Sequence, residues 1–173
     1  MGLLSADNPR DTAVAWVFVA VQFALLVVIV VLPTATAWPV SFALDRLALG
    51  AELVGAALVV LGIVGLGRSL TPLPSPVPHG ELREGGLYRW MRHPIYAGIM
   101  LLGIGVAVRS ASVVVAAVAF ALIAWLTVKA RWEERRLAPQ YPGYADYAAR
   151  TPRFVPGWPF HAAPRPAPDR QEN

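Results

Sequence analysis

Residues 94–128 read PIYAGIMLLGIGVAVRSASVVVAAVAFALIAWLTV, two apolar runs separated by the three residues 109–111. Apolar runs joined by so short a break predict a tight transmembrane helical hairpin. The first arm, 94–108, is about 22 Å long as a helix. Since about 30 Å of hydrocarbon must be crossed, this arm spans the membrane only if preceding residues extend it or the bilayer is locally thin.

Two further apolar segments precede the hairpin, at 13–32 and 47–66. The first is apolar except for Gln22. The second contains Glu52, which is costly in lipid unless it faces other helices or lies near the interface, so we expect a structural role near the helix end. The second segment also carries four glycines, and because small residues let helices approach closely, we expect it at the centre of the bundle. These glycines are Gly50, Gly55, Gly62 and Gly65.

The composition fits a membrane protein, with 56% hydrophobic and 15% charged residues. We predict an all-α fold: a polytopic transmembrane helical bundle of about four spans with a cytoplasmic C-terminal helical segment. The small residues 35–37 imitate a signal-peptide cleavage site, but the N-terminus lacks a basic region and the apolar run is too long. The net charge of +4 does not indicate nucleic-acid binding, because the basic residues cluster beside apolar segments. The absence of cysteine excludes disulfides and thiolate chemistry.

The orientation follows from the basic residues beside the spans. Four spans put Arg46 and Arg109 on one side and thirteen basic residues on the other, which predicts that both termini are cytoplasmic. The thirteen are Arg10, Arg68, Arg83, Arg89, Arg92, Lys129, Arg131, Arg135, Arg136, Arg150, Arg153, Arg165 and Arg170.

The chain divides into five predicted regions. They are a cytoplasmic N-terminus (1–12), two spans (13–66), a cytoplasmic proline-rich connector (67–92), the hairpin with a C-terminal catalytic segment (93–160), and a disordered tail (161–173). The connector carries TPLPSPVP at 71–78, whose prolines prevent a helix, so we expect an extended crossing of the bundle's inner face.

Polar residues gather at three places on the predicted cytoplasmic side. In the first, GLYRWMRHPIYAG at 86–98, Pro94 fits the first turn of a helix. The free N–H groups of that turn could hold a carboxylate. His93 and Tyr96 are three residues apart and would share one side. An aromatic belt at the lipid interface is the alternative.

The second place is WEERRL at 132–137, which continues the fourth span. Neighbouring helical residues point about 100° apart, so Glu133 and Glu134 cannot both face one pocket squarely. We expect one to enter the bundle and the other to meet arginine or water. A carboxylate beside lipid suits a cationic ligand. A solvated charge run with Arg135 and Arg136 is the alternative.

The third place lies at 141–156, where Tyr141, Tyr144 and Tyr147 recur every third residue. They predict one aromatic side of a short helix, lying on headgroups or closing over a pocket. Arg150 and Arg153 follow. An arginine here could hold an anionic acceptor by a bidentate contact, or bind anionic lipid without selectivity.

These residues resemble a known family, the isoprenylcysteine carboxyl methyltransferases and the related phospholipid N-methyltransferases. The resemblance consists of RHPIYAG at 92–98, EERRL at 133–137, and Tyr144-x-x-Tyr147 with Arg153 and Pro156. It covers about residues 60–158, so the first span lies outside it.

The resemblance implies S-adenosylmethionine as cofactor, bound between the last two membrane helices and the C-terminal segment, with a lipophilic acceptor arriving from the bilayer. The cofactor-binding residues it implies are Tyr88, Arg92, His93, Pro94, Tyr96, Gly98, Glu133 and Glu134. Catalytic roles would fall on Arg153 and Glu134, and acceptor binding on Tyr144, Tyr147 and Arg153. No metal is expected, and a monomer suffices.

Direct displacement at a sulfonium methyl needs alignment more than an acid–base relay, so the absence of a catalytic triad is no obstacle. A carboxylate acceptor needs no general base, whereas an amine or phenol must lose a proton. Three alternatives stay open: methylation of a lipid headgroup amine or a quinone-like molecule, a non-catalytic membrane scaffold, and a nicotinamide-dependent membrane reductase.

Overall fold

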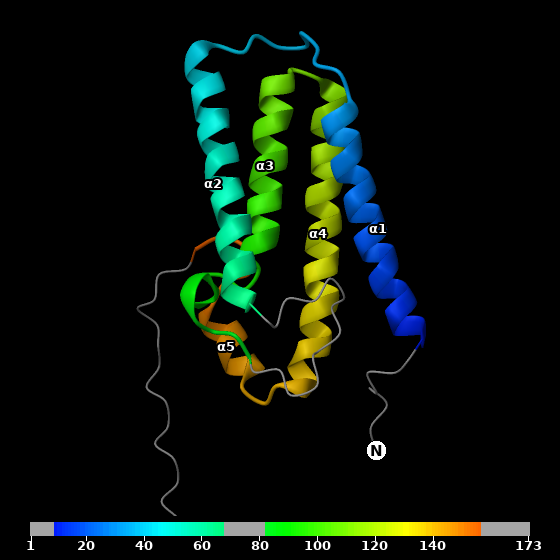
Figure 1. Ribbon diagram of the computed structural model, residues 1–173, viewed down its shortest axis with the longest axis vertical. Helices are drawn as coiled ribbons and strands as arrows, with labels where there is room; N and C mark the ends of the chain where they lie inside the picture. The colour runs from blue at the N-terminus through cyan, green and yellow to red at the C-terminus, as the bar shows by residue number, and fades with distance from the viewer. Residues whose placement is uncertain (1–8, 68–81, 157–173) are drawn as a thin grey trace, which may run out of the picture.

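The computed structural model describes residues 9–67 and 82–156, which form helices and connecting turns without a strand (Figure 1). Four long helices, α1 (Pro9–Val31), α2 (Phe42–Leu66), α3 (Pro94–Ser110) and α4 (Val113–Gln140), make the bundle. A short 3₁₀ helix, η2 (Gly86–Arg89), precedes α3, and α5 (Tyr144–Arg150) follows α4. The predicted all-helical class is confirmed.

Three of these helices, α1, α2 and α4, are long and apolar enough to cross a membrane, and α3 is a shorter apolar helix. The chain is therefore an integral membrane protein of about four apolar helices. The sequence placed the start of α2 at residue 47, five residues late, because Asp45 and Arg46 interrupt the apolar run. The helix begins earlier since Ser41 caps it, accepting a hydrogen bond from the backbone N–H of Leu44 at 3.2 Å.

The hairpin forms as predicted, with a turn at Ala111 and Ser112. Ala111 adopts the left-handed conformation (φ 47°) and Ser112 caps α4 by accepting from the backbone N–H of Val115. Arg109 and Ser110 belong to α3, which is therefore two residues longer than the apolar run. The arm remains short for a span.

The helices pack in the order α2, α3, α4, α1, so α3 and α4 stand between the other two (Figure 1). The expectation that α2 lies at the bundle centre is wrong. Only one stripe of α2 is packed: Gly55 and Gly62 press against α3, whereas a Cβ on Gly50 would meet nothing within 4 Å. A helix with a single small-residue stripe can bury only that face, which leaves Leu47 and Val64 exposed.

The core follows α4, where Val115, Leu122 and Leu126 are completely buried. Ile29 of α1 and Ile99 of α3 complete it from either side. Helix α4 contacts α1 and α3, and its extension beyond the apolar run contacts α5. That extension carries the paired glutamates.

The two ends of the bundle differ. At one end, Asp11 of α1 pairs with Arg136 of α4, close to α5. At the other, Arg109 pairs with Glu52 at 2.9 Å, which confirms a structural role for that carboxylate. The α1–α2 loop joins this end, with the Ala35 N–H donating to the carbonyl of Ser110 at 2.7 Å. The structure thus puts the N-terminus of α1 and the C-terminal segment together, while the side of the membrane they face stays a prediction.

Two predictions fall outside the described residues. They concern the extended proline-rich stretch at 71–78 and the disordered tail at 161–173.

Candidate active site

The site begins where the chain enters α3. Pro94 is the first helical residue, and a proline disfavours helical geometry in the residue before it, so His93 stands outside the helix at φ −127°, ψ 64°. The backbone N–H groups of Arg92 and His93 donate to the carbonyls of Pro152 and Arg153 at 2.9 and 3.0 Å. This pairing fixes the segment before α3 to the segment after α5, and it turns the side chains at 92 and 93 toward α4.

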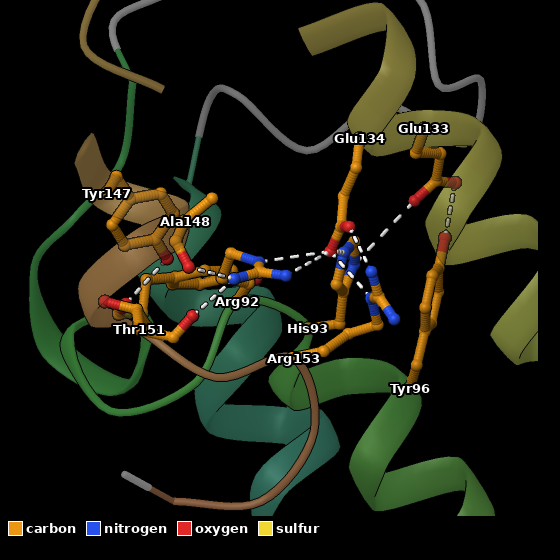
Figure 2. Close-up of polar contacts among 10 residues, drawn as sticks. Arg92, His93, Tyr96, Glu133, Glu134, Tyr147, Ala148, Thr151 and Arg153 are labelled. Atoms are coloured by element: carbon orange, nitrogen blue, oxygen red, sulfur yellow. Dashed lines mark hydrogen bonds and ion pairs between the residues drawn. The ribbon is translucent and has the colours of Figure 1, made fainter. Parts of the chain in front are cut away.

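Glu134 is the centre of the polar cluster (Figure 2). Its Oε1 accepts from Arg92 Nε at 3.1 Å and lies 3.1 Å from His93 Nε2. Arg153 holds the same carboxylate with two nitrogens, Nε at 2.9 Å and Nη2 at 2.6 Å. The Glu134 side chain is only 12% exposed, so these charges compensate one another away from bulk water.

Glu133 has different partners. The hydroxyl of Tyr96 donates to its Oε1 at 2.6 Å, and its Oε2 lies 3.9 Å from His93 Nδ1. Tyr96 stacks on His93, with ring centroids 5.3 Å apart and planes 7° apart. The imidazole therefore lies between the two carboxylates, one near each ring nitrogen (Figure 2).

Two predictions are confirmed by this geometry. The polar places at 86–98 and 132–137, which the sequence put on one common side, lie together at one end of the bundle. The glutamates also divide as expected, Glu133 toward the bundle and Glu134 toward arginines. The alternative of a solvated charge run is wrong for both carboxylates, since each is 12% exposed.

Helix α5 closes the cluster from the other side. Arg92 Nη1 donates to the carbonyls of Ala148, at 2.6 Å, and Thr151. Tyr144 and Tyr147 are buried on α5, and burial raises the pKa of both phenols above their usual range. Tyr141 is not on this helix: it caps α4, because Pro142 and Gly143 turn the chain before α5 begins.

The two buried tyrosines of α5 differ in one respect. The Tyr147 hydroxyl donates to the carbonyl of Tyr88 at 2.6 Å. The Tyr144 hydroxyl is equally buried but has no hydrogen-bond partner among the described residues. Its surroundings include Glu134, Arg92 and Arg153, whose charges act on its pKa. The hydrogen bond to Glu134 in turn raises the pKa of Arg153.

Two predicted cofactor residues lie against α2. A Cβ on Gly98 would stand 2.5 Å from the carbonyl oxygen of Gly55, so this glycine lets α2 and α3 touch. The Tyr88 hydroxyl donates to the carbonyl of Gly62 at 3.2 Å. Both residues thus have packing roles that the sequence did not reveal. Their place in a cofactor site stays a prediction, as does a carboxylate site at the first turn of α3.

A model of the isoprenylcysteine carboxyl methyltransferase (ICMT) family matches residues 47–139, more than half of the chain. The chain belongs to this family. The region matched runs from α2 to the end of α4 and so contains His93, Tyr96, Glu133 and Glu134. The predicted family resemblance is confirmed.

The relatives carry names of two kinds, a methyltransferase and a metal-resistance protein. The chain is 34% identical over 125 residues to Protein-S-isoprenylcysteine O-methyltransferase B of Arabidopsis thaliana. The aligned region covers 69% of this chain and 60% of that protein. It is 38% identical over 112 residues to the Cobalt-zinc-cadmium resistance protein CzcN of Cupriavidus metallidurans, which covers 60% of this chain and 51% of that protein. The chain therefore spans about half to three-fifths of these relatives' lengths.

The ICMT-family region does not contain the whole cluster. Arg153 and Tyr144 come from the segment after it, and α1 precedes it. Sequence reasoning also passed over Lys129, counted only as a basic residue at a span end, although its side chain is buried against Gln22 of α1. The signal was present, since a lone polar residue inside an apolar span needs a partner.

Proposed function

We propose that this protein transfers a methyl group from S-adenosylmethionine to a lipophilic acceptor in the membrane, and that the acceptor group is a carboxylate, as in isoprenylcysteine-type substrates. One observation carries the proposal: His93, Tyr96, Glu133 and Glu134 meet at one end of apolar helices, in a chain of the ICMT family.

The residues present fit this cofactor. S-adenosylmethionine carries an ammonium, a carboxylate and a sulfonium, and it supplies an electrophilic methyl group when bound. Glu133 and Glu134 are anionic groups suited to its cations. The buried Tyr144 hydroxyl without a described partner is a polar atom that a ligand can satisfy.

The two carboxylates have different tasks in this proposal. Glu134 is held by Arg92, His93 and Arg153, so it organises the cluster. Glu133 accepts one short hydrogen bond, from Tyr96, and retains lone pairs for a cationic ligand. We therefore assign cofactor recognition chiefly to Glu133 and positioning to Glu134.

Arg153 is the group we assign to the acceptor. Its contacts with Glu134 use Nε and Nη2, and its side chain is 29% exposed, more than the other members of the cluster. The remaining nitrogen, Nη1, can donate to an acceptor carboxylate. A carboxylate is already ionised near neutral pH, so no residue has to remove a proton before the displacement.

The first experiment measures binding of S-adenosylmethionine and S-adenosylhomocysteine to the full chain in detergent. We expect saturable binding that is weakened at least about tenfold, or about 1.4 kcal/mol, in His93→Ala and Glu133→Gln. Arg46→Ala is the control, because Arg46 is exposed at the opposite end. Absence of saturable binding by the unaltered protein would remove the proposal.

The second experiment identifies the acceptor. The protein is incubated with methyl-labelled S-adenosylmethionine and a membrane lipid extract, and the labelled lipid is treated with base. A methyl ester releases labelled methanol, whereas an N-methyl product keeps its label, which would point to a headgroup amine. Binding without any transfer would indicate a non-catalytic scaffold.

The orientation can be tested because the natural sequence has no cysteine. Arg131→Cys lies on the exposed surface near the cluster, and Phe42→Cys is exposed at the opposite end. In intact cells we expect an impermeant thiol reagent to label position 42 and not position 131. The reverse pattern would place the site outside the cytoplasm.

A further inference from the structure

The ammonium of Lys129 is buried where α1 and α4 meet. The residue is 4% exposed and stands one helical turn before Glu133. Its Nζ donates to Gln22 Oε1 of α1 at 2.9 Å and lies 5.0 Å from the centre of the Tyr96 ring. A buried ammonium is costly unless paired, so this arrangement needs an explanation.

The charged neighbours of Lys129 indicate which group it acts on. The arginines of the cluster contact Glu134, while Lys129 Nζ lies 4.0 Å from Glu133 Oε1. Each of the paired glutamates therefore has its own cation. The neighbours of Glu133 are His93 and Tyr96 from α3 and Lys129 and Glu134 from α4, and Lys129 is the amine among them.

The distances show how Gln22 contributes. At 4.0 Å, Lys129 Nζ is beyond hydrogen-bond distance of Glu133 Oε1 and attracts it through space, while its hydrogen bond to Gln22 Oε1 directs the amine toward α1. Lys129 and Glu133 are four residues apart on one helix, a spacing at which they could form a direct ion pair. Gln22 holds the ammonium back and so leaves the carboxylate open to a ligand.

We propose that Lys129 and Gln22 are positioning residues that keep Glu133 charged and open for the cationic methyl donor, which makes the first helix part of the active site. This inference rests on the proposed function. It extends the site to α1, which lies before the region that the ICMT family model matches.

The consequences of removing each residue follow from electrostatics. In Lys129→Met, Glu133 loses the amine that lies 4.0 Å from its Oε1, so its negative charge is less well compensated and it should attract a cation more weakly. In Gln22→Leu, the ammonium moves onto Glu133 and occupies its oxygens. Both variants should bind S-adenosylmethionine, which has a sulfonium, less well relative to S-adenosylhomocysteine, which has a neutral sulfur.

The test measures both dissociation constants in the full chain for Lys129→Met, Lys129→Arg, Gln22→Leu and Thr127→Val. We expect the preference for S-adenosylmethionine over S-adenosylhomocysteine to fall about tenfold in Lys129→Met and Gln22→Leu. Lys129→Arg keeps the charge and should recover most of it. Thr127→Val is the matched control: its hydroxyl on the same helix donates to the backbone of Ile123, away from the cluster.

A double variant shows whether Lys129 acts through Glu133. In a Glu133→Gln background, Lys129→Met should change the preference no further, because the group it acts on is gone. An unchanged or increased preference in Lys129→Met, or effects that simply add, would overturn the inference. If Lys129→Met does not fold, Gln22→Leu against Thr127→Val decides in the same way. Failure of the unaltered protein to bind either compound would instead refute the proposed function.

Discussion

Replacing Arg92 by alanine tests whether the cluster holds the C-terminal segment on the bundle. The Arg92 side chain is 10% exposed, and it binds Glu134 and the carbonyls of Ala148 and Thr151. Breaking a buried ion pair by removing one partner costs about 3–5 kcal/mol. Because Arg153 and a histidine still compensate Glu134, we expect the lower end, about 3 kcal/mol. For a chain of this size that corresponds to a fall in melting temperature of about 6–12 °C.

The assay is thermal unfolding in detergent, followed by the fluorescence of the six tryptophans. Arg153→Ala is the informative comparison, because Arg153 also contacts the Glu134 carboxylate with two nitrogens. Its side chain is 29% exposed, and it donates no hydrogen bond to a backbone carbonyl of α5. We expect about 1 kcal/mol there. Arg46→Ala, which removes an ion pair at an exposed arginine, should have almost no effect. Equal losses for Arg92→Ala and Arg153→Ala would refute the argument that burial and carbonyl contacts set the difference.

Three other predictions concern packing and ionisation. Tyr144→Phe should leave the melting temperature unchanged or raise it, because its hydroxyl has no partner among the described residues. Tyr147→Phe should lower the free energy of unfolding by about 1 kcal/mol, because it removes a hydrogen bond. A larger loss of stability in Tyr144→Phe than in Tyr147→Phe would contradict this. Gly98→Ala should destabilise by about 1–3 kcal/mol by forcing α2 and α3 apart, while Gly50→Ala, with open space around it, should be neutral or slightly stabilising in the same unfolding assay. In alkaline titration, burial holds the pKa of Tyr144 and Tyr147 above the ordinary 10.0, so the unfolded chain loses these protons first. The free energy of unfolding should stay constant below about pH 10 and fall above it, less steeply in Tyr144→Phe. A free energy that does not change with pH would show that these phenols ionise equally in the folded and unfolded chains.

Much of the site could be predicted because its signals are local. Pro94 suits the first turn of a helix, where its missing N–H has no partner to lose. The neighbourhood of His93 and Tyr96 followed from their spacing of three residues, although His93 lies just outside the helix. That Glu133 and Glu134 face different surroundings followed from the angle between neighbouring helical residues. The prediction that Tyr141 lies on the same helix as Tyr144 and Tyr147 was wrong. The spacing of three residues continues across Pro142 and Gly143, whereas the helix begins only after them.

The remaining features depended on which helices become neighbours. Gly98 was assigned to the cofactor from its place in a motif, but its contact with Gly55 exists only because α2 packs on α3. Likewise Lys129 finds Gln22 only because α1 packs on α4. The two residues of each pair are separated by tens of residues, and the sequence around either one does not predict which residue it will contact.

By itself, the sequence determined the apolar helices, the polar end of the hairpin and the residue types that gather there, because hydrophobicity, proline geometry and helical spacing act over a few residues. The tertiary structure decided the order of the helices, the position of α2 at the edge, and which cation serves which carboxylate. These depend on the rotation of each helix about its axis. A change of one residue in register turns a side chain by about 100°, which is enough to exchange one partner for another.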